Sequence, residues 1–230
     1  MAYHSHMLHT ITHGIANAKP PLLIAHGLFG SGRNWGVIAK RLSDERQVIA
    51  VDMRNHGSSL HSDDHSYTAL ADDLAEVIAA HGGQADVLGH SMGGKAAMVL
   101  ALEHAEMVNR LTVADIAPVS YGHSQQQYIN AMRALDLSRI EGRAEAQAAL
   151  LPLVEDPTLA SFFTQSLDLK ARQWRLNLAA LEANMPQILS FPTIDACFTG
   201  PALFLTGATS HYVTRDHRPQ IKALFPEARF

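Results

Sequence analysis

Cysteine is nearly missing from this 230-residue sequence: Cys197 is the only one, and a single cysteine excludes an intramolecular disulfide. Charge is also modest, because the formal net charge is -4 and charged residues make up 17% of the chain. This balance argues against a nucleic acid or an anionic membrane surface as the main partner. No run approaches 18 uninterrupted apolar residues, and the first residues lack an apolar stretch flanked by basic ones. The sequence therefore predicts a cytoplasmic protein without a membrane-spanning helix.

Histidine, in contrast, is abundant, with 14 residues. The chain has no C-x-x-C or H-E-x-x-H motif and no tight cluster of histidine, cysteine and aspartate, so a metal site has little support. We expect most histidines at the surface or in packing roles. The hydrophobic fraction of 47% is enough for one large α/β domain with an insertion, or for two small domains.

Short apolar runs alternate with helical patterns in the first half of the chain. Strands that are buried on both faces of a parallel sheet are apolar throughout, and five runs fit: Pro21 to Ala25, Gln47 to Asp52, Ala85 to Gly89, Arg110 to Asp115 and Ala202 to Thr206. The helical patterns cover Asn34 to Leu42, Tyr67 to Ala80 and Met92 to His104. Such alternation predicts a doubly wound, mostly parallel α/β sheet with sites at the C-terminal ends of its strands.

The alternation stops after Pro118. From about residue 120 to 191 the sequence predicts several helices, separated at four prolines: Pro152, Pro157, Pro186 and Pro192. We expect residues 120–195 to form a helical cap over the C-terminal edge of the sheet. Residues 1–119 and 196–230 then form the α/β core, whose C-terminal end is incomplete. A helical subdomain with a purely structural role is the alternative.

The stretch VLGHSMGGKA, residues 87–96, fits two motifs at once. From Gly89 to Lys95 it has the G-x-x-x-x-G-K spacing of a phosphate-binding loop, which requires Ser or Thr at the next position. From Gly89 to Gly93 it matches the G-x-S-x-G nucleophile elbow, a sharp turn between a strand and a helix. Because Ala96 lacks the hydroxyl, the elbow is favoured, with Ser91 as nucleophile.

A serine nucleophile needs a base, a group that orients the base, and donors for the oxyanion. The N–H groups of Met92 and of Leu28, in the HGLFG loop, are the candidate donors. Many proteins of this architecture carry the acid three residues after a glycine that follows the cap, but here Ser210 occupies that position. Asp115, at the end of a predicted strand next to the elbow, is therefore the candidate acid. A helix N-cap or loop-anchoring role for Asp115 remains open.

Five segments in the same order, HGLFG, DMRNHGSS, GHSMGGKA, VADIAPV and GATSHYV, resemble the α/β-hydrolase superfamily. The chain is most similar to small capped carboxylesterases of the bacterial YbfF type, related to the abhydrolase-domain-11 proteins, from about Leu22 to Phe230. The resemblance implies the α/β-hydrolase fold, short-chain acyl ester or thioester substrates and no cofactor. It also implies Ser91 as nucleophile, Asp115 as acid, and Leu28 and Met92 as oxyanion donors. In that family a lysine follows the elbow without binding phosphate.

The catalytic histidine of this family follows the last strand. That strand begins near residues 225–230 here, so we expect the histidine beyond Phe230. Within the chain, His123 and His211 are weaker alternatives, whereas His26 is expected to shape the oxyanion loop. His90 is expected to point away from the site, because it neighbours Ser91 at the end of a strand.

Aromatic residues provide candidate walls for an apolar acyl pocket, although each could equally belong to the core: Phe29, Trp35, Tyr121, Phe162 and Trp174. The predicted activity is carboxylesterase-type hydrolysis of small acyl esters, and thioesterase or lactonase chemistry stays open. A serine at the elbow argues against a haloalkane dehalogenase, which needs a carboxylate there. The competing hypothesis is a catalytically impaired hydrolase scaffold, or a fragment of one, that binds a ligand without turnover, because the base is missing from the sequence.

Overall fold

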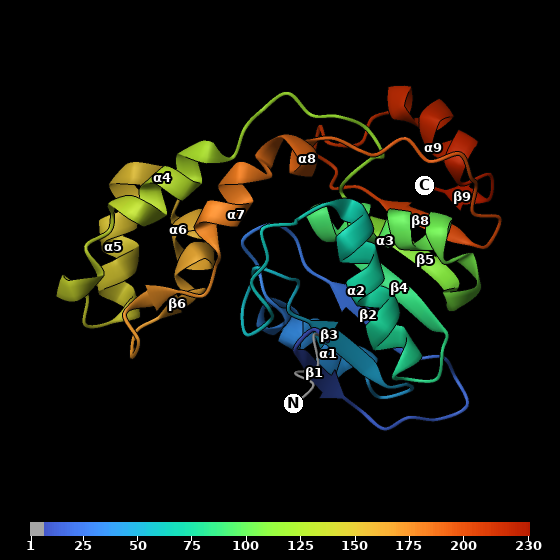
Figure 1. Ribbon diagram of the computed structural model, residues 1–230, viewed down its shortest axis with the longest axis horizontal. Helices are drawn as coiled ribbons and strands as arrows, with labels where there is room; N and C mark the ends of the chain where they lie inside the picture. Colours follow the sequence, from blue (N-terminus) through green and yellow to red (C-terminus); the bar gives the residue numbers. More distant parts are fainter. Residues whose placement is uncertain (1–6) are drawn as a thin grey trace.

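A mostly parallel sheet forms the centre of the computed structural model, which describes residues 7–230 (Figure 1). Within these residues seven strands pair in the order β1-β3-β2-β4-β5-β8-β9. Their bounds are β1 Thr10–His13, β2 Leu22–Ala25, β3 Val48–Val51, β4 Ala85–His90, β5 Val108–Ala114, β8 Ala202–Leu205 and β9 Ala228–Arg229. Only the edge strand β1 is antiparallel to its neighbour. The fold is therefore the doubly wound α/β arrangement that the sequence predicts.

Helices cover both faces of this sheet. The main apolar cluster lies between one face and the helices α2 Tyr67–Ala79, α3 Met92–Glu103 and α9 Arg218–Leu224. The other face packs against α1 Gly36–Leu42, where Ala39 contacts the strand residues Ile24 and Ala50. On that second face Leu205 keeps 48% of its surface exposed, so the described residues cover it less completely.

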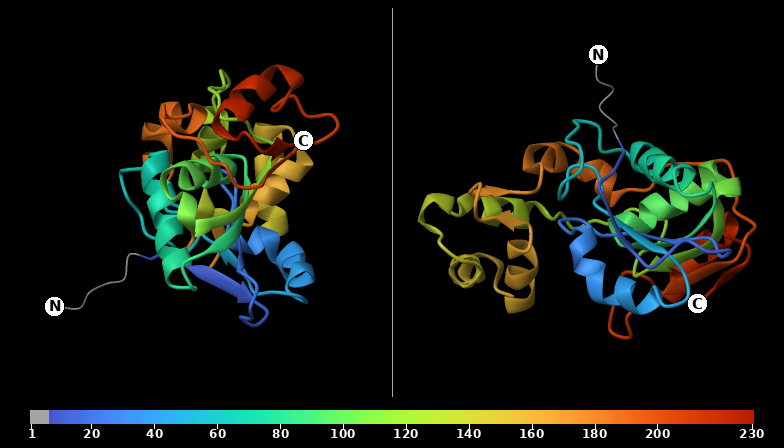
Figure 2. Two further views of the ribbon diagram at one scale, coloured as in Figure 1. Left: turned by 90° about the vertical axis from the view of Figure 1, so that its right-hand side faces the viewer. Right: turned by 90° about the horizontal axis from the view of Figure 1, so that it is seen from below.

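A helical block is inserted between β5 and β8 and stands beside the sheet, at the left of Figure 1 and of the right-hand view in Figure 2. It contains α4 Gln126–Ala134, α5 Arg143–Val154, α6 Pro157–Thr164, β6 Leu167–Asp168, β7 Gln173–Trp174, α7 Leu178–Ala183 and α8 Met185–Leu189. Hydrogen bonds tie it to loops at the carboxyl ends of the strands. Ser166 Oγ donates to the Phe29 carbonyl at 3.1 Å, and Gly57 N–H donates to the Arg175 carbonyl at 2.9 Å. The division into core and cap at residues 119 and 195 stays a prediction.

Three local details differ from the sequence-based expectations. The edge strand β1 was not expected, because TITH carries no apolar pattern long enough to indicate a strand. The β6–β7 hairpin interrupts the block that was expected to be helical. Pro152 lies inside α5 and does not separate two helices, although α5 ends two residues later at Val154.

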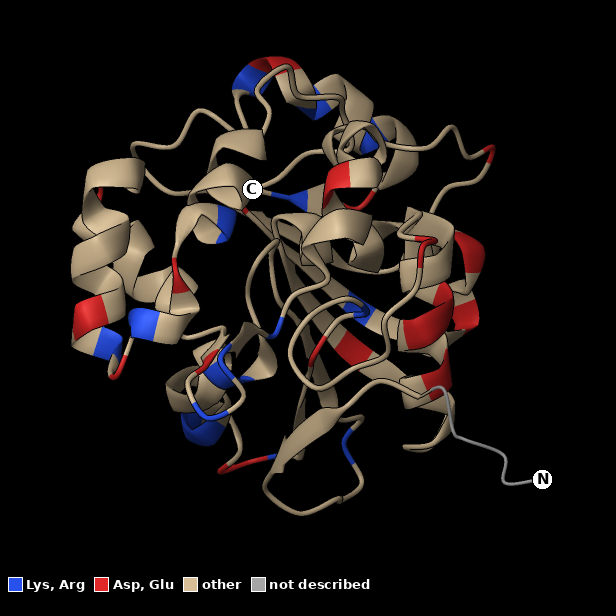
Figure 3. Ribbon diagram, turned by 60° about the vertical axis from the view of Figure 1, so that its left-hand side comes forward, with Lys and Arg blue, Asp and Glu red and all other residues tan. Residues whose placement is uncertain are grey.

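No helix among the described residues is both long enough and apolar enough to cross a lipid bilayer. Lysine and arginine positions are dispersed over several elements of the ribbon in Figure 3, and α2 contains three acidic residues, Asp72, Asp73 and Glu76. The absence of nucleic-acid and membrane partners stays a prediction, as does the cytoplasmic location.

Candidate active site

Ser91 occupies the turn between β4 and α3, and its backbone is strained. Its φ is 53° and its ψ is -120°, in a region that non-glycine residues rarely adopt. The chain reverses there so tightly that the flanking glycines have no room for a side chain. A Cβ on Gly89 would lie 2.3 Å from the Gly93 carbonyl oxygen, and a Cβ on Gly93 would lie 2.3 Å from the Ala25 carbonyl oxygen. The G-x-S-x-G spacing is thus a packing requirement of β2, β4 and α3.

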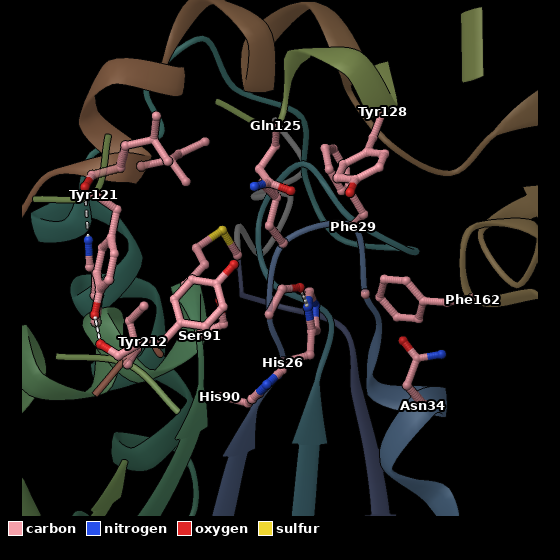
Figure 4. Close-up of a pocket in the computed structure, with 18 of the residues that line it drawn as sticks. His26, Phe29, Asn34, His90, Ser91, Tyr121, Gln125, Tyr128, Phe162 and Tyr212 are labelled. Atoms are coloured by element: carbon pink, nitrogen blue, oxygen red, sulfur yellow. Dashed lines mark hydrogen bonds between the residues drawn. The ribbon is translucent and has the colours of Figure 1, made fainter. Parts of the chain in front are cut away.

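A cavity of about 400 Å³ opens above this turn. Its wall combines residues of the sheet edge with residues of the helical block and is mainly apolar and aromatic. In Figure 4, Ser91 lies between Tyr121 and Tyr212 on one side and Phe29 and Phe162 on the other. A mainly apolar cavity with Ser91 in its wall suits a small ligand with an apolar part.

The HGLFG loop lies next to Ser91, since a Cβ on Gly27 would be 3.2 Å from Ser91 Cβ. The Phe29 N–H donates to His56 Nε2 at 3.1 Å, and the Gly30 N–H donates to the Gly27 carbonyl at 3.0 Å. Among the described residues, the N–H groups of Leu28 and Met92 donate to no protein acceptor. These two N–H groups, one in the HGLFG loop and one directly after Ser91, are therefore available to donate to an oxyanion.

Two buried imidazoles hold this loop in place. His26 donates from Nδ1 to the Gly27 carbonyl at 2.8 Å and accepts the Met53 N–H at Nε2 at 2.9 Å. His56 donates from Nδ1 to the Arg54 carbonyl and accepts the Phe29 N–H at Nε2. Burial lowers the pKa of His26 to about 4 and that of His56 to about 3, so both rings are neutral at pH 7. Each ring therefore keeps the lone pair that its acceptor role requires.

A third buried histidine, His65, lies between His56 and Met92. The His56 and His65 ring centroids are 5.9 Å apart, and His65 Nε2 lies 3.3 Å from Met92 Sδ. Asn55 Nδ2 donates to His65 Nδ1 at 3.0 Å, which leaves the proton on Nε2. Burial lowers the pKa of His65 to about 3. We call His26, His56 and His65 the histidine row.

Asp115 follows β5 directly and has a positive φ of 57°. Its N–H donates to the Leu205 carbonyl at 2.8 Å, and the Ser91 N–H donates to the Ala114 carbonyl at 3.1 Å. The register pairs His90 with Ala114, so Ser91 and Asp115 leave adjacent strands at the same level. Asp115 Oδ1 is buried and has no hydrogen-bond partner among the described residues. A buried carboxylate oxygen of this kind can accept a hydrogen bond from a nearby N–H or O–H group.

Four of the five aromatic residues named from the sequence line the cavity: Phe29, Trp35, Tyr121 and Phe162. Trp174 does not, and that prediction is wrong. Its indole Nε1 donates to the Met132 carbonyl at 3.0 Å, and its ring packs within the helical block. A side chain that supplies this internal contact is held away from the cavity.

The expected orientation of His90 also needs correction, because His90 contributes to the cavity wall. Gly27 has no side chain to cover it: a Cβ there would lie 3.1 Å from His90 Nδ1. The ring faces Trp35, with 6.1 Å between the centroids. Among the described histidines, none hydrogen-bonds to Ser91 or Asp115.

Several wall residues were not found from the sequence, including Gln125, Tyr128, Leu159 and Tyr212. Tyr212 lies in the turn that replaces the usual acid position, and its carbonyl accepts the Tyr121 hydroxyl at 2.6 Å. The helical spacing of Tyr128 and Leu159 suits core packing equally well. No local signal therefore separated them from core residues.

Residues 20–230 match the family described as alpha/beta hydrolase fold, and the chain belongs to this family. The sn-1-specific diacylglycerol lipase ABHD11 of Danio rerio is 38% identical over 217 residues, which are 90% of this chain and 68% of that protein. Esterase YbfF of Escherichia coli is 36% identical over 211 residues, covering 91% of this chain and 82% of the relative. Among solved structures, a marine microorganism esterase superimposes with a TM-score of 0.90 at 38% identity, covering 97% of this chain and 89% of its own.

Proposed function

We propose that this chain is a serine hydrolase that cleaves short-chain acyl esters through an acyl-enzyme on Ser91. The observation that carries the proposal is the setting of Ser91. It lies on a strained turn, opens into an apolar cavity, and has free backbone N–H groups on both sides. The esterase and lipase names of the relatives support the reaction class.

In the proposed mechanism the Ser91 Oγ attacks the ester carbonyl carbon while an imidazole takes its proton. The N–H groups of Leu28 and Met92 donate to the oxyanion, and each such donor is typically worth about 10²- to 10³-fold in rate. The imidazolium then protonates the leaving alcohol as the acyl-enzyme forms. Water, deprotonated by the same imidazole, releases the acid and restores Ser91.

Asp115 is the proposed partner of that imidazole. Its buried Oδ1 has no partner among the described residues, and an imidazole N–H donating to it would satisfy the oxygen and orient the ring toward Ser91. Since no described histidine hydrogen-bonds to the side chain of either residue, the proposal keeps the histidine beyond Phe230 as the base. The activity then depends on that histidine.

The helical block is the proposed cap, because α4, α6 and α8 supply wall residues such as Tyr128, Phe162 and Ile188. A cavity of about 400 Å³ is near the lower end of the range for small-molecule sites and favours short acyl groups. Small acyl esters or thioesters are the proposed substrates. The diacylglycerol lipase relatives make glycerolipid esters a second class to test.

A ligand-binding protein without turnover is the second candidate, because no described histidine hydrogen-bonds to Ser91. Both candidates bind an acyl group, but only the enzyme cleaves it. Octanoate binding measured by calorimetry, together with no hydrolysis of any ester, would favour the binding protein.

The test is hydrolysis of p-nitrophenyl acetate, butyrate, hexanoate and octanoate by the natural protein and by Ser91→Ala. We expect turnover that falls by about 10⁵- to 10⁶-fold in the variant. Thermal unfolding of both proteins controls for folding. A Ser91→Ala protein that keeps more than about one tenth of the turnover would contradict the assignment, because no acyl-enzyme could form on residue 91.

A further inference from the structure

Lys95 is the residue of the G-x-x-x-x-G-K match that the proposed mechanism does not use. It lies one helical turn after Ser91 on α3, where its N–H donates to the Ser91 carbonyl at 3.0 Å. Only 1% of its surface is exposed, although it carries an ammonium group. A buried lysine without a partner is unfavourable, so its contacts must be accounted for.

The Lys95 ammonium is held by carbonyl groups and aromatic faces. Nζ donates to the Ser190 carbonyl at 2.8 Å and to the Leu189 carbonyl at 3.2 Å. It lies 4.9 Å from the centre of the Tyr121 ring and 5.8 Å from that of Tyr67. No ion pair of the described residues includes Lys95. Burial lowers its pKa to about 8, so the ammonium is the main form at neutral pH.

Apart from Tyr67, which belongs to α2, these partners lie in the two chain segments that join the helical block to the sheet, residues 118–123 and 187–192, which we call the crossings. Tyr121 lies in the crossing that follows β5, Leu189 is the last residue of α8, and Ser190 directly follows it in the returning crossing. The two segments are also bonded to each other, because the Tyr121 N–H donates to the Leu189 carbonyl at 2.8 Å. The Leu189 carbonyl thus accepts from both Tyr121 and Lys95. The ammonium lies where both crossings meet the helix that carries the nucleophile.

We propose that Lys95 is a positioning residue that fixes both crossings of the helical block relative to Ser91 and thereby sets the shape of the acyl pocket. The proposal rests on the function proposed above. Tyr121, Ile188 and Leu189 line the cavity together with Lys95 itself, so a shift of the crossings moves the wall that an acyl chain would contact. A charged donor suits this place because it bonds two carbonyls at once and attracts both rings.

The test compares Lys95→Met, which keeps the aliphatic stem and removes the donors, with Leu100→Val, a change at a buried position five residues further along α3. Amide hydrogen exchange is measured over the two crossings, residues 118–123 and 187–192. These include the Tyr121 N–H, which donates to the Leu189 carbonyl and therefore reports on the contact between them. We expect exchange there to be at least about tenfold faster in Lys95→Met than in Leu100→Val. The KM for p-nitrophenyl octanoate, a neutral ester, is expected to rise about tenfold in Lys95→Met only.

Two further experiments distinguish the positioning role of Lys95 from a general effect on stability and from the proposed enzymatic function. If Lys95→Met does not fold, Tyr121→Leu, which removes the aromatic face from the same contact, must give the local exchange increase. In the natural protein, labelling of Ser91 by a fluorophosphonate tests the proposed function independently. Unchanged exchange at both crossings in a folded Lys95→Met protein would overturn the positioning role, whatever the labelling result. Failed labelling with increased exchange would overturn only the enzymatic proposal.

Discussion

The carboxyl edge of the sheet and the helical block supply opposite walls of one cavity, and they do so by different means. At the sheet edge, backbone geometry decides the positions: glycines pack without space for a Cβ, Ser91 has a positive φ, and buried histidines hold the loop. In the block, side chains such as Tyr128 and Phe162 reach the cavity from helices. The difference suggests that the edge determines the chemistry, while the block determines which acyl group fits.

The largest effect is expected from Gly93→Ala at the sheet edge. The new Cβ would lie 2.3 Å from the Ala25 carbonyl oxygen, between β2 and α3, where neither backbone can move away freely. We expect the free energy of unfolding to fall by about 4 kcal/mol or more, measured by urea denaturation. The matched control is Gly122→Ala near the block, where nothing lies within 4 Å of the added Cβ. A similar loss in both variants would remove the contrast between the two regions.

Acid is expected to destabilise the sheet edge through the histidine row. The pKa values of His26, His56 and His65 are lowered to about 4, 3 and 3, below the ordinary value of 6.5. The unfolded chain therefore binds more protons below pH 6.5, and stability that is complete above that pH is lost as the pH falls toward 4. Between pH 6.5 and 5.5 the three groups together lower the free energy of unfolding by roughly 3 kcal/mol.

Urea denaturation at several pH values measures the slope with which the free energy of unfolding falls as the pH is lowered. His56→Gln keeps an acceptor near the Phe29 N–H but does not titrate, and it should reduce the slope by about one third. A slope that is the same in the variant would show that the histidine row does not cause the acid sensitivity.

Phe162→Ala in the block is expected to change selectivity more than stability. Phe162 lines both the main cavity and a neighbouring hollow beside α6, so its removal joins the two spaces. We expect the ratio of kcat/KM for octanoate to that for butyrate esters to rise about tenfold, which corresponds to about 1.4 kcal/mol. An unchanged ratio would place the acyl group elsewhere.

The smallest effect is expected from Trp174→Phe, which serves as the control for Phe162→Ala. The change removes the hydrogen bond from Trp174 Nε1 to the Met132 carbonyl and costs about 1 kcal/mol of stability. Because Trp174 does not line the cavity, the same ester ratio should stay within about twofold. A tenfold change in that ratio would contradict the inward packing of Trp174.

The sequence was most informative where a local pattern determines the structure. The buried strands and the close packing of Gly89 and Gly93 follow from short segments, so the sheet and the elbow could be predicted. Trp174 and His90 were misjudged because their positions depend on contacts with distant residues. The contacts of Lys95 could not be predicted for the same reason, because its carbonyl partners are 94 and 95 positions away in the chain.

The most direct test of the central claim is intact-mass spectrometry after treatment with a fluorophosphonate, on the natural protein and on Ser91→Ala. The account predicts one covalent adduct per chain in the natural protein and none in the variant, because only an activated serine reacts in this way. An equal adduct on both proteins, or no adduct on the folded natural protein, would contradict the claim that Ser91 is the nucleophile of a working hydrolase.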